Sequence, residues 1–245
     1  MSDMITLEKN GTVAVISMNT DENRHNLEFI TAFNNCLDTV EQDQKITAVI
    51  LTSSAEKNWS LGVDLTWVSQ PTTTVPQIVE FMNGMGAIFK RMLTFPVPLI
   101  AAMNGHVFGN GSVLACACDF RLMKSDRGYF CFPEVDVMVP FLPSMIPLIH
   151  QAMSPQFFNR LAMTGQRVDA QTLLEQQVVE AVFDDNDALQ AGALEFAAQF
   201  KKNRWIYAEN KKQKNQEVFA VMAAKDEAFI EKSCAMLAKM MGKKA

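Results

Sequence analysis

The sequence predicts an α/β fold, and three observations lead to that prediction. Several short runs rich in β-branched residues are almost continuously apolar, as in strands covered on both faces. Runs with the three-and-four apolar spacing of amphipathic helices lie between them. Apolar residues make up 49% of the 245 residues and charged residues 20%, which is a globular balance with room for a full core. Together these features indicate a sheet with helices around it.

The predicted elements follow the chain in a strand, helix, strand order. The expected strands are residues 12–19, 47–54, 98–105, 119–124 and 178–184. Helices are expected over residues 27–41 and 75–93. The second of these ends just before Phe95-Pro96-Val97-Pro98, because two prolines forbid a helix there.

The last third of the chain is predicted to be mostly helical. Ser154-Pro155 opens a helix and Gly165 closes it. Residues 205–241 hold almost no glycine or proline and predict two long helices with a break near Lys225-Asp226. Their apolar faces must pack on the α/β core or on a neighbouring subunit. We therefore expect an α/β core over residues 1–195 and a C-terminal helical region over 196–245.

Charge and cysteine content exclude several classes of protein. The 22 basic residues stand against 27 acidic ones, a net charge of −5, whereas a nucleic-acid binder is usually more basic. No run approaches the roughly 18 to 20 apolar residues of a membrane span, and the start lacks the pattern of a secretory signal. Five cysteines at irregular spacing in apolar surroundings predict reduced thiols in the core. We expect a cytoplasmic protein.

Two glycine turns are candidate binding elements. Asn104-Gly105-His106-Val107-Phe108-Gly109-Asn110-Gly111 follows an apolar strand and precedes a helix, whose first N–H groups are free to bind an anion. Its spacing differs from the nucleotide-binding glycine motifs. The second turn, Leu61-Gly62-Val63-Asp64-Leu65, follows the second strand. A purely structural role is an equal alternative for the first turn, and it is the favoured interpretation of the second turn taken alone.

Glu134 is the first candidate for a catalytic base. It lies within Tyr129-Phe130-Cys131-Phe132-Pro133-Glu134-Val135-Asp136-Val137, where apolar neighbours raise the pKa of a carboxyl group toward neutrality. A surface glutamate at a turn is the alternative. Asp136 is a possible second carboxylate, since alternation along a strand places it on the same face as Glu134.

These segments, taken in order, resemble the enoyl-CoA hydratase/isomerase (crotonase) superfamily over nearly the whole chain. The matching segments are NTDENRHNL at 19–27, LGVDL at 61–65, PLIAAMNGHVFGNG at 98–111, ACDFR at 117–121 and LAMTG at 161–165. The resemblance implies a crotonase-type (ClpP/crotonase) superhelix of ββα units with a C-terminal helical region.

The resemblance also implies an active site. The backbone N–H groups of Val63 and Asn110 match the family's two donors to the thioester oxygen of an acyl-CoA. Of the two glutamates of the family's hydratases, Val113 stands at the first position and Glu134 at the second, which disfavours hydration. Leu142 stands at the position of the extra aspartate in dienoyl-CoA isomerases. The pattern resembles the Δ3,Δ2-enoyl-CoA isomerases, in which one glutamate shifts a 3-enoyl-CoA double bond to the 2-position.

The remaining expectations come from the same resemblance. Lys57, Arg24 and Leu61 are expected near the coenzyme A part of the substrate, with no metal or redox cofactor, in a homotrimer or homohexamer acting in fatty acid metabolism (β-oxidation). Hydrolysis, decarboxylation, weak hydration and non-catalytic acyl-CoA binding are the alternatives. His25 and His150 show no convergent partners in the sequence, and His106 is given no catalytic role.

Overall fold

The computed structural model describes residues 4–240. Its larger sheet has six strands in the order β1-β2-β3-β5-β7-β9. Their bounds are β1 Ile5–Asn10, β2 Val13–Met18, β3 Ala48–Ser53, β5 Leu99–Met103, β7 Phe120–Lys124 and β9 Ala181–Phe183. All neighbouring pairs are parallel except β1 and β2, which are antiparallel. The five predicted strands are confirmed, and β1 is an additional strand at the edge.

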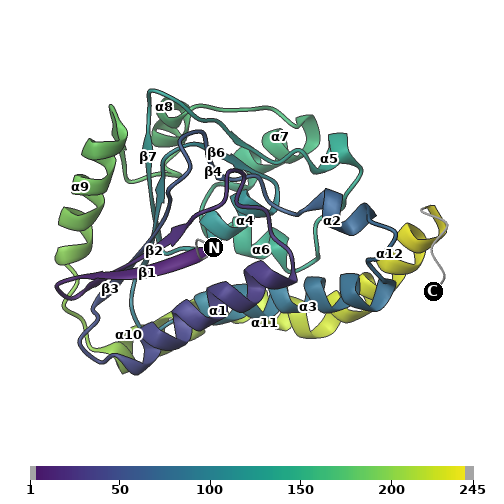
Figure 1. Cartoon of the computed structure of the whole chain (residues 1–245), viewed down its shortest axis with the longest axis horizontal. Helices are drawn as coiled ribbons and strands as arrows, with labels where there is room; N and C mark the ends of the chain where they lie inside the picture. Colours follow the sequence, from purple (N-terminus) through teal and green to yellow (C-terminus); the bar gives the residue numbers. More distant parts are fainter. Residues whose placement is uncertain (1–3, 241–245) are drawn as a thin grey trace.

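Both faces of this sheet are covered, as the continuous apolar runs predict. All six residues of β3 are buried. Ala48 and Ile50 pack in one apolar cluster with helix α9 (Asn186–Ala198), while Val49 and Leu51 pack in another with helices α1 (Leu27–Gln42) and α3 (Val75–Met92). Figure 1 shows α9 on one side of the sheet and the long helices on the other. Helix covering on both faces explains why these strands lack alternation.

A second, three-stranded parallel sheet positions the candidate site. Its order is β4-β6-β8, with β4 Asn58–Ser60, β6 His106–Phe108 and β8 Phe130–Cys131. Short helices follow these strands: α2 (Leu65–Ser69), α4 (Asn110–Ala117) and α5 (Glu134–Val137). The sequence analysis missed all three strands, and β6 lies inside the predicted glycine turn. The carboxyl ends of three parallel strands therefore meet at one edge.

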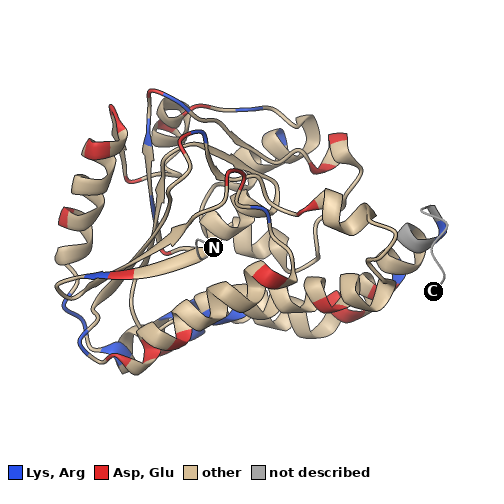
Figure 2. Ribbon diagram, viewed as in Figure 1, with Lys and Arg blue, Asp and Glu red and all other residues tan. Residues whose placement is uncertain are grey.

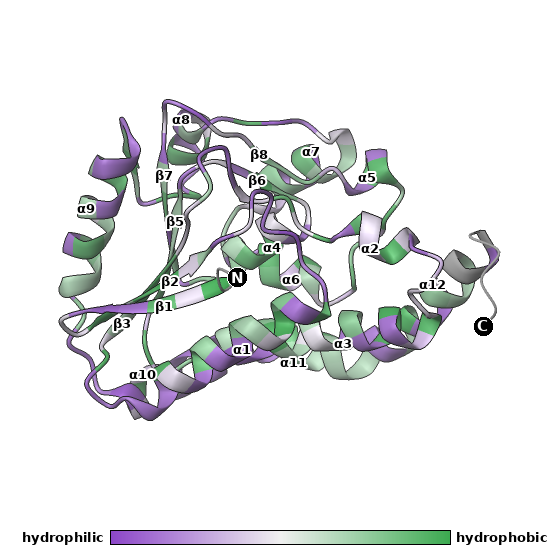
Figure 3. Ribbon diagram, in the orientation of Figure 1, coloured by the Kyte–Doolittle hydropathy of each residue, from purple (hydrophilic) through white to green (hydrophobic). Residues whose placement is uncertain are grey.

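Helix α4 is almost completely buried at the centre of the molecule. Every residue of α4 is buried. Figure 2 shows no charged residue on α4 or on the neighbouring helix α6 (Met145–Ile149), and Figure 3 colours α4 as hydrophobic. Helix α7 (Pro155–Thr164) begins and ends as predicted, with Ser154 as its N-cap and Gly165 in the left-handed conformation as its C-cap. Helix α8 (Ala170–Glu175) follows.

The C-terminal helices fold back on their own chain. Their order is α10 Arg204–Lys214, α11 Gln216–Val221, a π-helical turn Met222–Asp226 and α12 Glu227–Met240. The predicted break near Lys225-Asp226 is wrong, because the π-turn continues the helix there and the interruption falls at Asn215. Ile230 and Cys234 of α12 join an apolar cluster that contains Leu142 and touches Val63. The proposed boundary between 195 and 196 falls inside α9, and the division into two parts stays a prediction.

Candidate active site

The two predicted glycine turns touch one another at the carboxyl ends of β4 and β6. Gly62 has φ +75°, and a Cβ there would lie 2.7 Å from both the Asn110 nitrogen and the Phe108 carbonyl oxygen. Gly109, with φ 56° and ψ −126°, is the N-cap of α4. Only glycine accommodates such a conformation and such a close approach at low cost. Val63 and Asn110, the residues after these glycines, are therefore brought side by side.

The amides of Val63 and Asn110 are free to bind a ligand. Among the hydrogen bonds of residues 4–240, neither N–H group is a donor. The neighbouring amides do have acceptors: His25 N–H donates to Gly62 O at 2.7 Å, and Asp64 N–H donates to His25 O at 2.9 Å. Asn110 is also the first residue of a helix, where N–H groups lack internal acceptors. Two unpaired amides on adjoining turns are the arrangement that stabilises a developing oxyanion.

Glu134 lies across from these turns. It is the first residue of α5, directly after β8 and Pro133. A Cβ on Gly109 would stand 3.7 Å from its Oε1 atom, so the carboxylate faces the turn that carries Asn110. Its Oε2 atom is buried and has no hydrogen-bond partner among the described residues. Burial raises the pKa of Glu134 from 4.5 to about 7, which suits a group that both accepts and returns a proton.

Apolar side chains on α4, α7 and the segments on either side of α5 belong to the core. Val113, one turn into α4, is 0% exposed. The rings of Phe132, Phe141 and Phe158 pack against one another edge to face, with centroids 5.5 to 5.7 Å apart. Leu142 is buried as well. The raised pKa of Glu134 comes from burial of its carboxyl group, because burial disfavours the charged form.

Asp136 does not share a face with Glu134. The sequence analysis expected a strand there, but residues 134–137 form the helix α5, on which residues two apart point in opposite directions. The Asp136 carboxylate lies against Gly165 at the end of α7. Asp64 is likewise committed elsewhere, since its Oδ1 accepts the Trp67 amide at 2.8 Å as the N-cap of α2. Glu134 is thus the carboxylate that faces the paired amides.

His25 belongs to this site, although the sequence analysis set it aside. It is completely buried, and its Nδ1 and Nε2 atoms lie 2.9 Å from Asn110 Nδ2 and 3.0 Å from Ser60 Oγ. Burial, and secondarily the charge of Arg24, lowers its pKa to about 3. The partners come from residues far along the chain, so the sequence offered only an unusual histidine inside a family landmark.

The residues expected near coenzyme A are divided between two places. Arg24 donates to Glu22 Oε2 at 2.8 Å and to the carbonyl oxygens of Leu61 and Val63 at 3.3 Å each. Arg24 and Leu61 thus lie together beside the Val63 turn, where the guanidinium holds the turn. Lys57 stands at the opposite end of β4. The roles of all three residues toward coenzyme A stay predictions.

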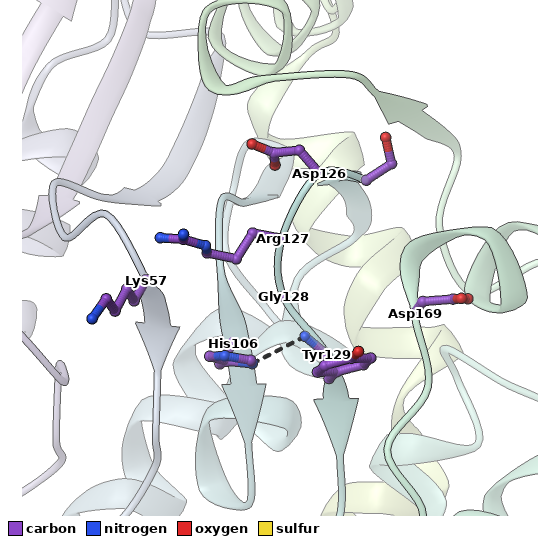
Figure 4. A pocket seen from close by; sticks show the side chains of 8 residues that line it. Lys57, His106, Asp126, Arg127, Gly128, Tyr129 and Asp169 are labelled. Atoms are coloured by element: carbon purple, nitrogen blue, oxygen red, sulfur yellow. Dashed lines mark hydrogen bonds between the residues drawn. The ribbon is translucent and has the colours of Figure 1, made fainter.

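Lys57 borders an open hollow of about 540 Å³ at the amino ends of β4, β6 and β8. His106, Asp126, Arg127 and Tyr129 also line it (Figure 4). The Tyr129 amide donates to His106 Nδ1 at 3.2 Å, and Arg127 pairs with Glu56 at 3.0 Å. None of the paired-amide residues or Glu134 lines this hollow.

Other site types have no support in the described residues. Within residues 4–240, no group of three or more His, Cys, Asp or Glu side chains is placed to hold a metal ion. In the same range, no helix has the length and apolar character to span a membrane. All five cysteines are free and buried, as predicted, and burial raises the pKa of both Cys116 and Cys118 to about 12.

The comparisons with known proteins agree with the fold. The family model for enoyl-CoA hydratase/isomerase matches residues 8–241. The peroxisomal enoyl-CoA delta isomerase 2 of Arabidopsis thaliana is 22% identical over 235 residues, covering 92% of this chain and 98% of the relative. Carnitinyl-CoA dehydratase of Escherichia coli is 30% identical over 205 residues, covering 81% and 75%. An enoyl-CoA hydratase/isomerase family structure from Pseudomonas syringae, 24% identical, covers 94% of this chain and 98% of its own with a TM-score of 0.84.

The α/β fold, with its mainly parallel six-stranded core and small second sheet, is the crotonase fold of these structural neighbours. The chain belongs to the enoyl-CoA hydratase/isomerase family. The predicted fold class is thereby confirmed, with enoyl-CoA delta isomerases among the relatives.

Proposed function

We propose that the protein is a Δ3,Δ2-enoyl-CoA isomerase that works with Glu134 as its single acid–base group. The observation that carries the proposal is one half-buried carboxylate, with a buried Oε2 atom and a pKa of about 7, facing the turn that carries one of two unpaired amides. Val113, which the resemblance matches to the other glutamate of the hydratases, is apolar and buried, so it offers no second acid–base group. An allylic proton shift needs one group that accepts and returns a proton, and this site has it.

The proposed reaction moves one proton and one double bond. The thioester oxygen of a 3-enoyl-CoA accepts hydrogen bonds from the Val63 and Asn110 amides. Glu134 removes a proton from C2, and the electron pair of that C–H bond forms a dienolate whose negative charge rests on the thioester oxygen. The protonated carboxyl then returns its proton to C4, which leaves the double bond between C2 and C3. Atoms, charge and oxidation state are all balanced.

Two preorganised donors account for much of the expected acceleration. Removal of one oxyanion donor typically costs about 3 kcal/mol of barrier in a water-excluded site. The thioester itself makes the C2 proton acidic, so coenzyme A enters as part of the substrate and the step uses no metal or redox cofactor. We further propose that Lys57, Arg24 and Leu61 lie along the coenzyme A part, and that the active form is a homotrimer or homohexamer in the cytoplasm serving fatty acid β-oxidation.

Hydration or dehydration is the second candidate, because one relative is named a carnitinyl-CoA dehydratase. Adding water needs one group to orient the water and another to deliver a proton. Asp64, the residue after Val63, is committed to the α2 N-cap, and Asp136, on the same helix as Glu134, lies against Gly165. This commitment favours isomerisation over hydration.

Product analysis with two substrates tests the proposal. We expect 3-hexenoyl-CoA to give 2-hexenoyl-CoA, and 2-hexenoyl-CoA to gain no water. Glu134→Gln should lose about 10² to 10⁴-fold in turnover, because it removes the base. Asp136→Asn, on the same short helix, is the matched control and should stay within about 3-fold.

Three results would contradict the proposal. The first is 3-hydroxyhexanoyl-CoA as the main product from either substrate. The second is wild-type turnover in Glu134→Gln. The third is tight acyl-CoA binding in calorimetric titration without any product, which would identify a non-catalytic binder.

A further inference from the structure

One residue, His25, is hydrogen-bonded to both turns of the candidate site. Its backbone is hydrogen-bonded to the residues on both sides of Val63. The His25 N–H donates to Gly62 O at 2.7 Å, and the His25 carbonyl oxygen accepts a hydrogen bond from the Asp64 N–H at 2.9 Å. Its side chain reaches Ser60, at the end of β4, and Asn110, at the start of α4. The peptide segment and the ring thus connect the two elements that carry the unpaired amides.

The hydrogen bonds around the ring determine where its proton sits. Ser60 Oγ donates its proton to Asn23 O at 2.8 Å, so toward His25 this oxygen acts as an acceptor. The imidazole therefore donates from Nε2–H to Ser60. Its Nδ1 atom is then an acceptor for the Asn110 side-chain NH₂ at 2.9 Å. This pattern requires the uncharged Nε2–H tautomer, because a proton on Nδ1 would face the Asn110 donor.

The ring has little freedom to move. It is 0% exposed and packs on Phe29 with ring centroids 4.2 Å apart. Ser60 Oγ also accepts a hydrogen bond from the Gly62 amide at 3.2 Å, and the Asn110 nitrogen lies so close to Gly62 that a Cβ on Gly62 would stand 2.7 Å from it. A displacement of the imidazole would therefore shift Asn110 relative to the Val63 turn. Shifts of a few tenths of an ångström matter to hydrogen bonds aimed at a developing charge.

We propose that His25 is a positioning residue for the oxyanion site, and that its ring sets the spacing between the Val63 and Asn110 amides. It takes no part in proton transfer and touches no reacting atom. The inference rests on the proposed function only in assuming that an acyl thioester binds between these amides, which holds for isomerisation, hydration or hydrolysis alike. The Asn110 side chain is assigned the same positioning role, as the link between ring and turn.

Four variants separate positioning from simple packing. His25→Leu removes both ring hydrogen bonds while keeping an apolar side chain in the core. His25→Gln is the conservative variant, because its amide carries a donor and an acceptor with a separation close to that of the ring nitrogens. Asn110→Ala removes the side-chain link but keeps the backbone amide, and the His25→Leu/Asn110→Ala double variant tests whether the two act together.

The main readout is the infrared stretching frequency of the thioester carbonyl in hexanoyl-CoA, labelled with ¹³C at C1 and bound to each variant. Hydrogen bonds from the two amides polarise this bond and lower its frequency. We expect a large red shift with the wild type and with His25→Gln, and a much smaller shift with His25→Leu, with Asn110→Ala and with the double variant.

Kinetics with 3-hexenoyl-CoA give the second readout. His25→Leu should lose about 10- to 100-fold in kcat with less than a 3-fold change in KM, since the donors act mainly in the transition state. His25→Gln should stay within about 5-fold of the wild type. The double variant should be no worse than the worse single one, because both changes break the same link.

Asn215→Ala is the matched control. Asn215 is also a buried polar residue, and its side chain donates to Leu93 O and Lys211 O, away from both turns. We expect it to lower the unfolding temperature while leaving the carbonyl frequency unchanged.

Two results would overturn the inference. One is a carbonyl frequency with His25→Leu equal to that of the wild type, and the other is a loss of activity in His25→Leu that only matches the fraction of this variant that is unfolded. The infrared measurement needs no turnover. The inference about His25 therefore holds if the wild type shows a red shift but proves to catalyse a different reaction. A wild type with no red shift at all would instead refute the paired-amide site and the proposed function with it.

Discussion

Glu134→Gln should gain stability relative to the wild type as pH rises from 4.5 to 8, while losing most of its activity. Burial raises the pKa of this carboxyl from 4.5 to about 7, so between these values the folded state binds more protons than the unfolded state. Stability therefore falls as pH rises from 4.5 through 7. The difference of roughly 2.5 between the two pKa values corresponds to about 3 kcal/mol of destabilisation above pH 7. Glutamine carries no charge and escapes this penalty.

The assay compares urea unfolding of wild type and Glu134→Gln at pH 4.5 and pH 8, at equal protein concentration. A buried glutamine amide has its own cost when it lacks partners, on the order of 1 to 3 kcal/mol, but that cost is the same at both pH values. We compare the unfolding free energy of the variant minus that of the wild type at each pH. We expect this difference to be about 3 kcal/mol more positive at pH 8 than at pH 4.5. Glu180→Gln, an exposed position, is the control and should show no such change.

The pKa of Glu134 also governs catalysis, but activity rises with pH where stability falls. The base must be unprotonated to remove the C2 proton, so kcat/KM should rise with pH through about 7. An activity profile that rises near 4.5, or equal pH dependence of stability in wild type and Glu134→Gln, would refute the reasoning that burial tunes this group.

Three further substitutions have defined outcomes. Gly109→Ala should lower turnover by at least about 10-fold, because the backbone conformation at this position costs a non-glycine residue about 1 to 3 kcal/mol and Asn110 follows it; activity assays and circular dichroism would show this. Val113→Glu should lower the unfolding free energy by about 3 kcal/mol at pH 8 and by less at pH 5, where the new buried carboxyl is protonated; urea titration at both pH values tests it. Lys211→Met should cost about 3 kcal/mol because it leaves Asp119 without its buried partner at 2.7 Å, with kcat of the folded protein unchanged.

The larger sheet was predictable because its strands are continuous apolar runs. Residues 47–54 and 98–105 contain β3 and β5, which are buried on both faces. The small sheet was not, since β4, β6 and β8 have only three, three and two residues. No periodicity can be measured over so few positions. The C-terminal break was misplaced for a related reason: with hardly any glycine or proline, the sequence carried no signal for the interruption at Asn215 or for the π-turn after it.

Parts of the site could be predicted where the backbone conformation requires a particular residue type, because that residue is visible in the sequence. Gly62 and Gly109 are needed for positive φ and close approach, so the turns beside Val63 and Asn110 stood out. Glu134 stood out because a carboxylate sits inside an apolar run. The face of Asp136 was wrong because four residues of helix cannot be told from a strand by alternation alone.

His25 could not be found from the sequence because its role depends on distant contacts. Its two ring partners, Ser60 and Asn110, are 35 and 85 residues away along the chain. A histidine between Arg24 and Asn26 carries no pattern of its own. Only the folded chain, with both turns pressed against each other, brings its two ring nitrogens between a hydroxyl and an amide.

The measurement that tests the central claim most directly follows deuterium from one carbon to another. 3-Hexenoyl-CoA with both C2 hydrogens replaced by deuterium is converted in ordinary water, and the product is analysed by NMR and mass spectrometry. If one carboxyl carries the proton, 2-hexenoyl-CoA must form with part of the removed deuterium at C4. A product whose C4 position holds only solvent hydrogen, or one that has gained a hydroxyl at C3, would contradict a single-glutamate shuttle.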